Sequence, residues 1–442
     1  MVTELVKPEN NYQAAFQALK QTKPTVAWVE LVRESAMDRF ESLGFPSVRD
    51  EEWKYTNLAQ LAKERFLPSV AKSELTVQDI DRFSFPETAG SQVVLINGVL
   101  RDDLSQTEKL DSIVAIDLFT AIADARYSKL IRNYLARNAN YHDKGLTALN
   151  TAFLQSGVFI LIPKNVELST PLQLTCVADS TETGSANFPR ILVVAEENSS
   201  AKLIESFVSA GQNSYFTNAV VEVVMEDGAR LEHTRLQRES SQAFHVATTS
   251  VELGRGSNYK STSINLGGKL ARHDISVVMN HEGAECWVDG LYVVGHDQHT
   301  DTHSVIDHKQ PYCNSHQLYK GILDGNGRAV FNGKVFVREG AQKTDALQTN
   351  KNLLLSPQAR VDTKPQLEIY ADDVKCAHGA AVGQLDQDEL FYLETRGINP
   401  KLAKNLLTYG FAEEVIGKIG VESIRNEVDK AVLNQLHTQL DT

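Results

Sequence analysis

The fold is decided by four segments that share one form: Asn198-Ser-Ser-Ala-Lys-Leu-Ile204, Asp227-Gly-Ala-Arg-Leu-Glu-His233, Gly254-Arg-Gly-Ser-Asn-Tyr-Lys260 and Glu282-Gly-Ala-Glu-Cys-Trp-Val288. Each is a polar turn with an Ala or Ser, followed by a stretch of alternating character. The Ala or Ser stands at positions 201, 229, 257 and 284, so the spacings are 28, 28 and 27 residues. A period of this length is typical of stacked units that bury their apolar faces against one another.

Short runs rich in β-branched residues extend this pattern on both sides of the repeat. They are Val93–Ile96, Val158–Ile162, Ile191–Val194, Asn218–Val224, Ile275–Val278 and Val330–Val337. Such runs are strand signals, and long helices do not alternate with them, which disfavours a doubly wound sheet. The sequence therefore predicts a mainly β protein built as a β-solenoid or parallel β-helix. A β-sandwich with evenly spaced turns is the alternative.

Apolar residues at helical spacing mark both ends of the chain. The predicted helical stretches are Asn11–Leu19, Val26–Leu43, Ile116–Ala139 (inside the β region), Pro400–Phe411 and Glu413–Leu440. We therefore divide the chain into an N-terminal helical region (1–90), a β-helix core (91–385) and a C-terminal helical region (386–442). A helical tail is expected because an open solenoid end exposes apolar core and unpaired strand edges.

The composition restricts the class of protein. The 442 residues include 44 Lys and Arg against 57 Asp and Glu, and the net charge of -13 disfavours non-specific binding of nucleic acid. No apolar run approaches the roughly 18 residues of a membrane span, and the first residues do not resemble a signal or transit peptide. The four cysteines contain no Cys-x-x-Cys pair, which is typical of a reducing compartment. These features predict a cytoplasmic protein.

Signatures of common enzyme classes are missing from the sequence. There is no phosphate-binding Gly-x4-Gly-Lys-Ser/Thr loop, no Gly-x-Gly-x-x-Gly opening a helix, no Gly-x-Ser-x-Gly elbow and no His-Glu-x-x-His. We therefore predict a protein without ATPase, dehydrogenase or hydrolase activity of its own.

The densest polar cluster is His296-Asp-Gln-His-Thr-Asp-Thr-His-Ser-Val-Ile-Asp-His308. On a strand, His299, Asp301 and His303 fall on one face, where imidazole and carboxylate groups could bind a metal. A metal-dependent β-helix or cupin-like enzyme using His296, His299 and His303 is therefore one hypothesis. The other is a polar ladder on a solvated or interface face, which we favour because no spacing here is specific for a metal.

A second candidate site is the Cys-x-His pair formed by Cys376 and His378. At positions i and i+2 of a strand, both side chains point the same way. Thiolate and imidazole are ligand types for iron, zinc or an iron–sulfur cluster, and Lys375 and His378 would favour the thiolate. Two ligands do not complete a site, so a buried structural cysteine beside a hydrogen-bonded histidine remains an equal alternative.

Five longer motifs follow one another along the chain: Glu51-Glu-Trp-Lys-Tyr-Thr56, Arg338-Glu-Gly-Ala-Gln-Lys-Thr-Asp345, Gln348-Thr-Asn-Lys-Asn-Leu-Leu-Leu-Ser356, Cys376-Ala-His-Gly-Ala-Ala-Val-Gly383 and Phe391-Tyr-Leu-Glu-Thr-Arg-Gly397. Together they resemble the SufB/SufD family of SUF iron–sulfur cluster assembly proteins, and the first motif makes the chain similar to the SufD branch. The resemblance implies a right-handed parallel β-helix flanked by α-helical N- and C-terminal regions.

The resemblance also implies a function, that of a non-ATPase scaffold subunit rather than an enzyme. Such a subunit pairs with SufB, and both bind the ABC-type ATPase SufC, to assemble iron–sulfur clusters for transfer to apoproteins. It implies no cofactor on the isolated chain, a nascent iron–sulfur cluster at the SufB–SufD interface, and indirect contact with iron and sulfide donors. An unpaired interface strand favours a homodimer when the chain is isolated.

The resemblance assigns roles to two groups of residues. Cys376 and His378 match the family's Cys-x-His, so we expect them to serve cluster assembly at the SufB interface. The segment from Phe391 to Ile419 matches the region expected to dock SufC, with candidate contacts at Phe391, Tyr392, Leu402, Leu406, Leu407, Tyr409 and Phe411. ATP-driven dimerisation of SufC would then shift the interface as a rigid body. A purely architectural subunit that contributes no ligand is the remaining alternative.

Overall fold

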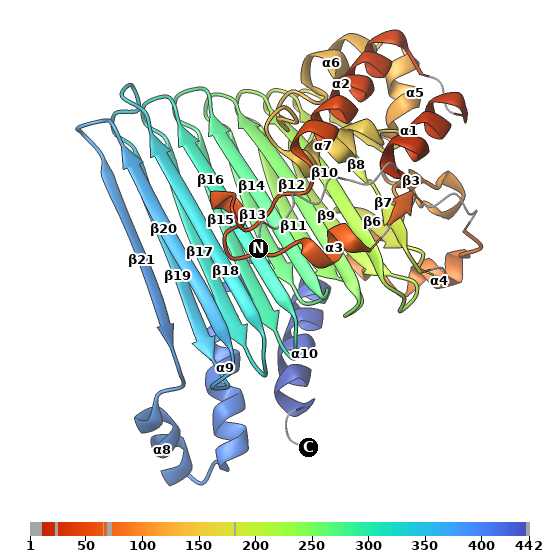
Figure 1. The fold of residues 1–442 in the computed structure, drawn as a ribbon. Helices are drawn as coiled ribbons and strands as arrows, with labels where there is room; N and C mark the ends of the chain where they lie inside the picture. The colour runs from red at the N-terminus through yellow and green to blue at the C-terminus, as the bar shows by residue number, and fades with distance from the viewer. Residues whose placement is uncertain (1–10, 23–24, 65, 69–72, 181–182, 439–442) are drawn as a thin grey trace.

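The computed structural model describes residues 11–22, 25–64, 66–68, 73–180 and 183–438. Its strands form two long sheets that face each other, and successive strands from β8 onward alternate between them (Figure 1). Each turn of the chain therefore adds one strand to each sheet, and the predicted β-solenoid is confirmed. Strands in this part of the chain pair in parallel with the strand one turn away.

The first sheet, sheet A, runs in the order β20 (Arg360–Ile369), β18 (Arg328–Val337), β16 (His299–His308), β14 (Leu270–Met279), β12 (Ala243–Leu253), β10 (Tyr215–Met225), β8 (Arg190–Ala195), β5 (Val158–Ile162) and β4 (Val114–Asp117). Two short strands lie off this path: β7 (Ser185–Asn187) pairs with β10, and β1 (Leu67–Pro68) pairs with β7. Sheet B runs in the order β21 (Lys375–Gly383), β19 (Asp345–Leu354), β17 (Asn314–Leu323), β15 (Glu285–Val294), β13 (Asn258–Asn265), β11 (Arg230–Arg238), β9 (Ser200–Ser209), β6 (Leu172–Ala178), β2 (Gln92–Ile96) and β3 (Val99–Leu100).

The register of sheet B reproduces two of the three sequence spacings. Arg230 pairs with Asn258, and Asn258 pairs with Glu285, which are the offsets of 28 and 27 residues found in the repeat. The first offset is different, because Arg230 pairs with Ser200, two residues before the position that a spacing of 28 would require. Small residues still fill the corner of each turn, since Ala229 and Ala284 are fully buried.

The interior between the sheets holds both apolar and polar side chains. Its apolar part is one cluster to which almost every turn contributes Val, Ile, Leu or Ala side chains. Tyr292 lies inside as well, and its hydroxyl hydrogen-bonds Asn350 and Asn352 at 3.1 and 2.5 Å. Hydrogen bonding offsets the cost of burying these amides and the phenol.

Helices cover the solenoid at two places (Figure 1). Near its first turns lie α1 (Asn11–Thr22), α2 (Ala27–Leu43), α3 (Ala59–Lys63), α4 (Val77–Asp81), α5 (Leu118–Ala123), α6 (Ser128–Tyr134) and α7 (Gly145–Ala152), with short 3₁₀ turns at η2 (Pro86–Thr88) and η3 (Asp102–Leu104). A further 3₁₀ turn, η1 (Glu51–Trp53), lies against the later strands of sheet A. The chain ends in α8 (Gln387–Thr395), α9 (Pro400–Ile416) and α10 (Glu422–Thr438). No helix among the described residues is long and apolar enough to cross a membrane.

The helical stretch predicted at Ile116–Ala139 is shorter and more broken than its periodicity suggested. Strand β4 occupies its first two residues, and α5 and α6 are separate helices. The break falls at Asp124, whose carboxylate accepts a hydrogen bond from the backbone N–H of Arg126 at 2.8 Å. Such a local bond between side chain and backbone competes with continuation of a helix.

The last turn of the solenoid, β20 and β21, is much more exposed than the turns before it. Every residue of β10 is buried, whereas β20 contains no buried residue and β21 has a single half-buried one, Cys376. Among the described residues, each of the two strands has a hydrogen-bonded neighbour on one side only, which is β18 for β20 and β19 for β21. Both sheets therefore end in an open edge at this end of the molecule.

Candidate functional site

The predicted Cys-x-His pair lies on β21, at the open end of the solenoid. Cys376 pairs in register with Ala346, and its side chain packs partly against the interior apolar cluster. His378 pairs with Gln348 and is exposed. Because residues two apart on a strand share a face, His378 also lies on the side that faces the interior. It is exposed because no further turn formed by the described residues covers it.

The environment of Cys376 does not activate its thiol. Partial burial, together with the nearby carboxylate of Asp345, raises the pKa of Cys376 above its ordinary value. The expectation that Lys375 and His378 would favour the thiolate was therefore wrong for this chain alone. Lys375 comes directly before Cys376 on the strand, and so its side chain points to the outer face.

The C-terminal helices carry an exposed apolar surface. Asp386 and Asn399 cap α8 and α9, because their side chains accept hydrogen bonds from backbone N–H groups in the first turn. The apolar residues with large exposed fractions are Phe391 (67%), Tyr392 (56%), Leu402 (50%) and Leu406 (44%). Isolated exposed apolar residues are common, but four on two consecutive helices form a candidate contact surface.

The other three predicted docking residues are less exposed. Leu407 and Tyr409 are half-buried. Phe411 packs against the outer face of sheet B, where the Lys320 ammonium lies over its ring, 4.6 Å from the centroid, and donates to its backbone carbonyl at 2.8 Å. Phe411 thus holds α9 to the solenoid.

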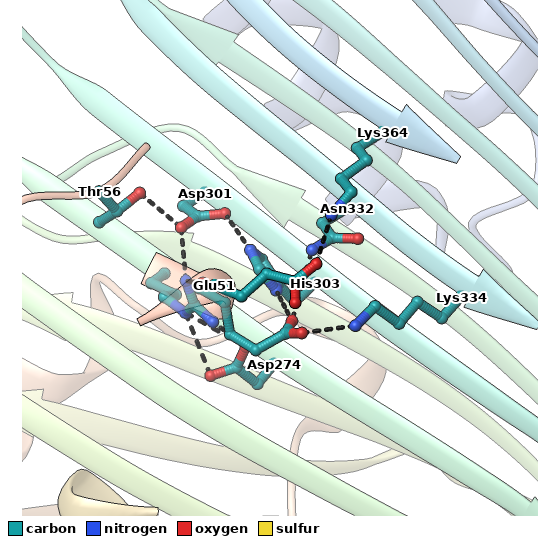
Figure 2. Close-up of polar contacts among 10 residues, drawn as sticks. Glu51, Thr56, Asp274, Asp301, His303, Asn332, Lys334 and Lys364 are labelled. Carbon is teal, nitrogen blue, oxygen red and sulfur yellow. Dashed lines mark hydrogen bonds and ion pairs between the residues drawn. The ribbon is translucent and has the colours of Figure 1, made fainter. Parts of the chain in front are cut away.

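The histidine-rich strand β16 receives a segment from the N-terminal region. His299, Asp301 and His303 share the outer face of sheet A, as the strand alternation predicted. The Thr56 hydroxyl donates a hydrogen bond of 2.5 Å to Asp301 and lies 2.8 Å from Nε2 of His299. Figure 2 shows Thr56 reaching Asp301 from a different part of the chain.

His303 is held between two carboxylates. Its Nε2 lies 3.1 Å from Asp301, and its Nδ1 lies 3.2 Å from Glu52. Burial alone would lower the pKa of His303, but Asp301 and Glu52 raise it above its ordinary value. The hydrogen bond from His303, with that from Lys334 at 2.5 Å, lowers the pKa of Glu52 to about 2.

The proposed metal ligands are not gathered into a site. His299 and His303 already have protein partners, and His296 lies in the turn before β16 with a φ of 50°. No group of three or more His, Cys, Asp and Glu residues is arranged to hold a metal within the described ranges. The geometry favours the alternative interpretation, a polar ladder that binds another part of the same chain.

Sequence reasoning missed that the residues Glu51–Thr56 are the partner of this strand. The signal was present in the sequence, because this charged and aromatic stretch fits neither helical nor strand periodicity. Nothing local, however, connects it to a strand about 250 positions later. A cavity of 580 Å³ lies beside this stretch and is lined in part by Trp53, Arg272 and His303.

Two family models match the chain almost from end to end. Residues 177–411 match the SUF system FeS cluster assembly, SufBD core domain, and residues 6–174 match the SufBD protein N-terminal region. The chain belongs to the SufB/SufD family. The core-domain match includes Cys376 and His378, and the N-terminal match includes Glu51–Thr56.

Several relatives of this SufB/SufD-family chain are similar over nearly their whole length. An iron–sulfur cluster assembly SufBD family protein of Synechocystis is 37% identical, with 90% of this chain and 89% of the relative covered. The iron–sulfur cluster assembly protein SufD of Escherichia coli is 34% identical, covering 87% and 88%. The SufD of Bacillus subtilis is 28% identical, covering 94% and 96%. Similarity to SufD supports assignment to the SufD branch of the family.

Proposed function

We propose that this chain is a non-ATPase scaffold subunit of the SUF system that pairs with a SufB-type chain and holds a SufC-type ATPase. The observation that carries the proposal is the open last turn of the solenoid, with exposed His378 and half-buried Cys376 on its final strand. An uncovered turn with free edges is a template for pairing with another chain.

The partner at this end is a second β-solenoid. Strands β20 and β21 each offer one row of backbone N–H and C=O groups, and a similar pair of edge strands would continue both sheets. A SufB-type chain is the expected partner in the complex. A second copy of this chain takes its place when the chain is isolated, which gives a homodimer.

A nascent iron–sulfur cluster is the cargo of this interface and is not bound by the isolated chain. His378 would contribute an imidazole and Cys376 a thiol, and the partner supplies the remaining ligands. The raised pKa of Cys376 makes the histidine the stronger candidate, because a thiolate is the form that binds metal. Iron and sulfide then arrive from donors that this chain need not contact itself.

The ATPase docks on the exposed apolar surface of α8 and α9. Phe391, Tyr392, Leu402 and Leu406 supply apolar area that would be removed from water. Since α9 is anchored on β17 through Lys320 and Phe411, a movement of the bound ATPase would be transmitted to the solenoid as a rigid-body shift. The four free cysteines suit a reducing cytoplasm, and the chain itself performs no catalytic step.

Co-expression with SufB and SufC chains, followed by size-exclusion chromatography with light scattering, tests the assembly. A stable complex with one copy of this chain, one SufB and two SufC is expected. A chain that elutes alone and carries its own stoichiometric metal would contradict the scaffold proposal.

Single substitutions in that complex test the two proposed surfaces separately. His378→Ala is expected to lower cluster yield at least several-fold while the complex remains assembled, and His142→Ala, an exposed histidine near α7, is the control. Leu402→Ser is expected to weaken SufC binding, with Leu31→Ser on α2 as the control for an exposed leucine. If the double replacement of Cys376 and His378 leaves cluster yield unchanged, the subunit is purely architectural.

A further inference from the structure

Residues 51–56, which we call the N-terminal strap, cross the outer face of sheet A from strand to strand, along the direction in which the solenoid turns stack. The strap contacts side chains from four successive strands of the sheet: Arg272 on β14, Asp301 and His303 on β16, Asn332 and Lys334 on β18, and Lys364 on β20 (Figure 2). His303, Asn332 and Lys364 are neighbours in register. One short segment therefore connects an inner turn with the last one.

The inner half of the strap is firmly anchored. The Arg272 guanidinium lies over the Trp53 ring at 3.7 Å from its centroid and donates to the backbone carbonyl of Glu52 at 2.7 Å. Thr56 is fully buried and hydrogen-bonds Asp301. Arg272 is itself fixed by Asp274 and Asp301 at 2.8 and 2.7 Å. Buried, charge-assisted contacts of this kind are the stronger class of polar interaction.

The outer half of the strap reaches the strands nearest the open end through opposite charges. Glu52 accepts a hydrogen bond from Lys334 on β18, and Glu51 accepts one of 2.8 Å from Lys364 on β20. Lys364 belongs to the last turn, and no strand in the described part of the chain pairs beyond it. The strap thus ties the least protected strand of sheet A to residues anchored two and three strands further in.

The last turn needs such a tie. In a solenoid each turn is stabilised mainly by its two neighbours, so a terminal turn loses one of the two interfaces. Local opening begins where few apolar contacts and many exposed backbone bonds are found. β20 and β21 fit that description, because neither contains a fully buried residue.

We propose that the N-terminal strap acts as a splint that holds the last turn of the solenoid in place. It keeps β20 in register for the partner, and it also keeps β21 in register because a short loop joins the two strands. Glu51 and Glu52 are then positioning residues for Cys376 and His378, which they do not touch. The proposed stabilisation of the last turn is inferred from the contacts of the strap alone. Its consequence for the partner rests on the proposed function.

Hydrogen exchange of the isolated full-length chain tests the splint. In a Glu51→Gln, Glu52→Gln variant, the amides of β20 that are bonded to β18 are expected to exchange about tenfold faster, and those of β21 less so, with β10 and β12 unchanged. Glu196→Gln, Glu197→Gln makes the same charge change near the first turns, where Glu197 pairs with Lys164 at 2.5 Å, and serves as the control. Equal exchange of residues 360–383 in both variants overturns the proposal.

A milder variant distinguishes loosening of the last turn from general unfolding of the chain. Lys364→Gln removes only the outermost contact of the strap and is expected to speed exchange of β20 about threefold, with Lys164→Gln as its control. Faster exchange spread evenly over β12 to β20 would show that the strap stabilises all of these strands equally. That result would overturn a role specific to the last turn.

The consequence for assembly is measured separately, as the affinity of the Lys364→Gln chain for a SufB chain by titration. A several-fold loss is expected, because an unordered edge strand must be ordered on binding. Faster exchange with unchanged affinity would overturn the positioning role and leave the splint intact. Absence of any binding by the unmodified chain would instead refute the proposed function.

Discussion

Thr56 and Asp301 are joined by a hydrogen bond of 2.5 Å although 245 residues separate them. Asp301 is almost fully buried, and burial alone would raise its pKa, but Arg272 and His303 hold that pKa well below the ordinary value. The carboxylate therefore stays ionised inside the protein. The bond shows that the histidine-rich strand serves as the binding face for the N-terminal strap.

Thr56→Val is expected to destabilise the chain by about 1–3 kcal/mol, because it leaves the buried groups of Asp301 and His299 without a hydroxyl partner. Urea unfolding followed by circular dichroism measures the change. Ser47→Ala, at a half-buried position just before the strap where the hydroxyl accepts only a local hydrogen bond from the Arg49 N–H, is the control. A midpoint equal to that of the control would mean that the bond contributes nothing to stability.

Arg190→Met is expected to cost about 3–5 kcal/mol, since it removes one partner of a buried ion pair. Arg190 and Glu222 are fully buried, 2.5 Å apart, and Glu222 also accepts the backbone N–H groups of Ala136 and Ala139. Thermal and urea unfolding test this. Arg126→Met breaks the exposed pair with Asp124 and should leave the midpoint nearly unchanged. Similar losses of unfolding free energy in both variants would contradict the expectation that the buried ion pair matters more than the exposed one.

His308 is expected to make stability fall as the medium is acidified. Burial lowers the pKa of His308 from 6.5 to about 4, so between these values the unfolded chain binds more protons than the folded one. The stabilisation is complete above pH 6.5 and is lost as the pH falls toward 4. Between pH 7 and pH 5 the loss should be about 2 kcal/mol.

Comparison with a His308→Gln variant isolates this contribution. The variant retains a side chain able to reach Ser315, whose hydroxyl lies 2.8 Å from Nε2 of His308. Other titrating groups, His303 among them, act equally in both proteins and cancel in the difference. Parallel stability curves at pH 5, 6 and 7 would show that His308 does not carry the effect.

Cys376 is expected to react with iodoacetamide at pH 7.5 more slowly than free cysteine does, because its raised pKa keeps it as a thiol. The reaction should accelerate as the pH is raised. Mass spectrometry of the labelled peptides measures the rate, and the buried Cys286 provides an internal reference that should remain unlabelled. A rate equal to that of free cysteine would show that the thiol is activated after all.

Much of the fold could be predicted because it depends on local, repeated requirements. The spacings of 28 and 27 residues reappear as the strand register from Arg230 to Asn258 and Glu285. All six predicted strand runs lie within strands of the structure. A periodic apolar face has to be buried in every turn, so the period can be recognised without knowing any long-range contact.

The candidate site was predictable only in part. The alternation of a strand correctly placed Cys376 with His378, and His299 with His303, on common faces. It did not predict the direction of the Cys376 pKa shift, which depends on burial and on Asp345 from the neighbouring strand. Ionisation depends on what surrounds a group in space, and spacing along the chain does not report that.

The sequence by itself therefore determined the solenoid, its helical ends and the family motifs, because each is written in residues close together in the chain. Only the tertiary structure decided that Glu52 and Thr56 occupy the polar face of β16 and that the last turn is left open. Both follow from how segments some 250 residues apart are brought together. Ion pairs and hydrogen bonds across such separations leave no periodic signal, since their geometry exists only once the intervening turns have stacked.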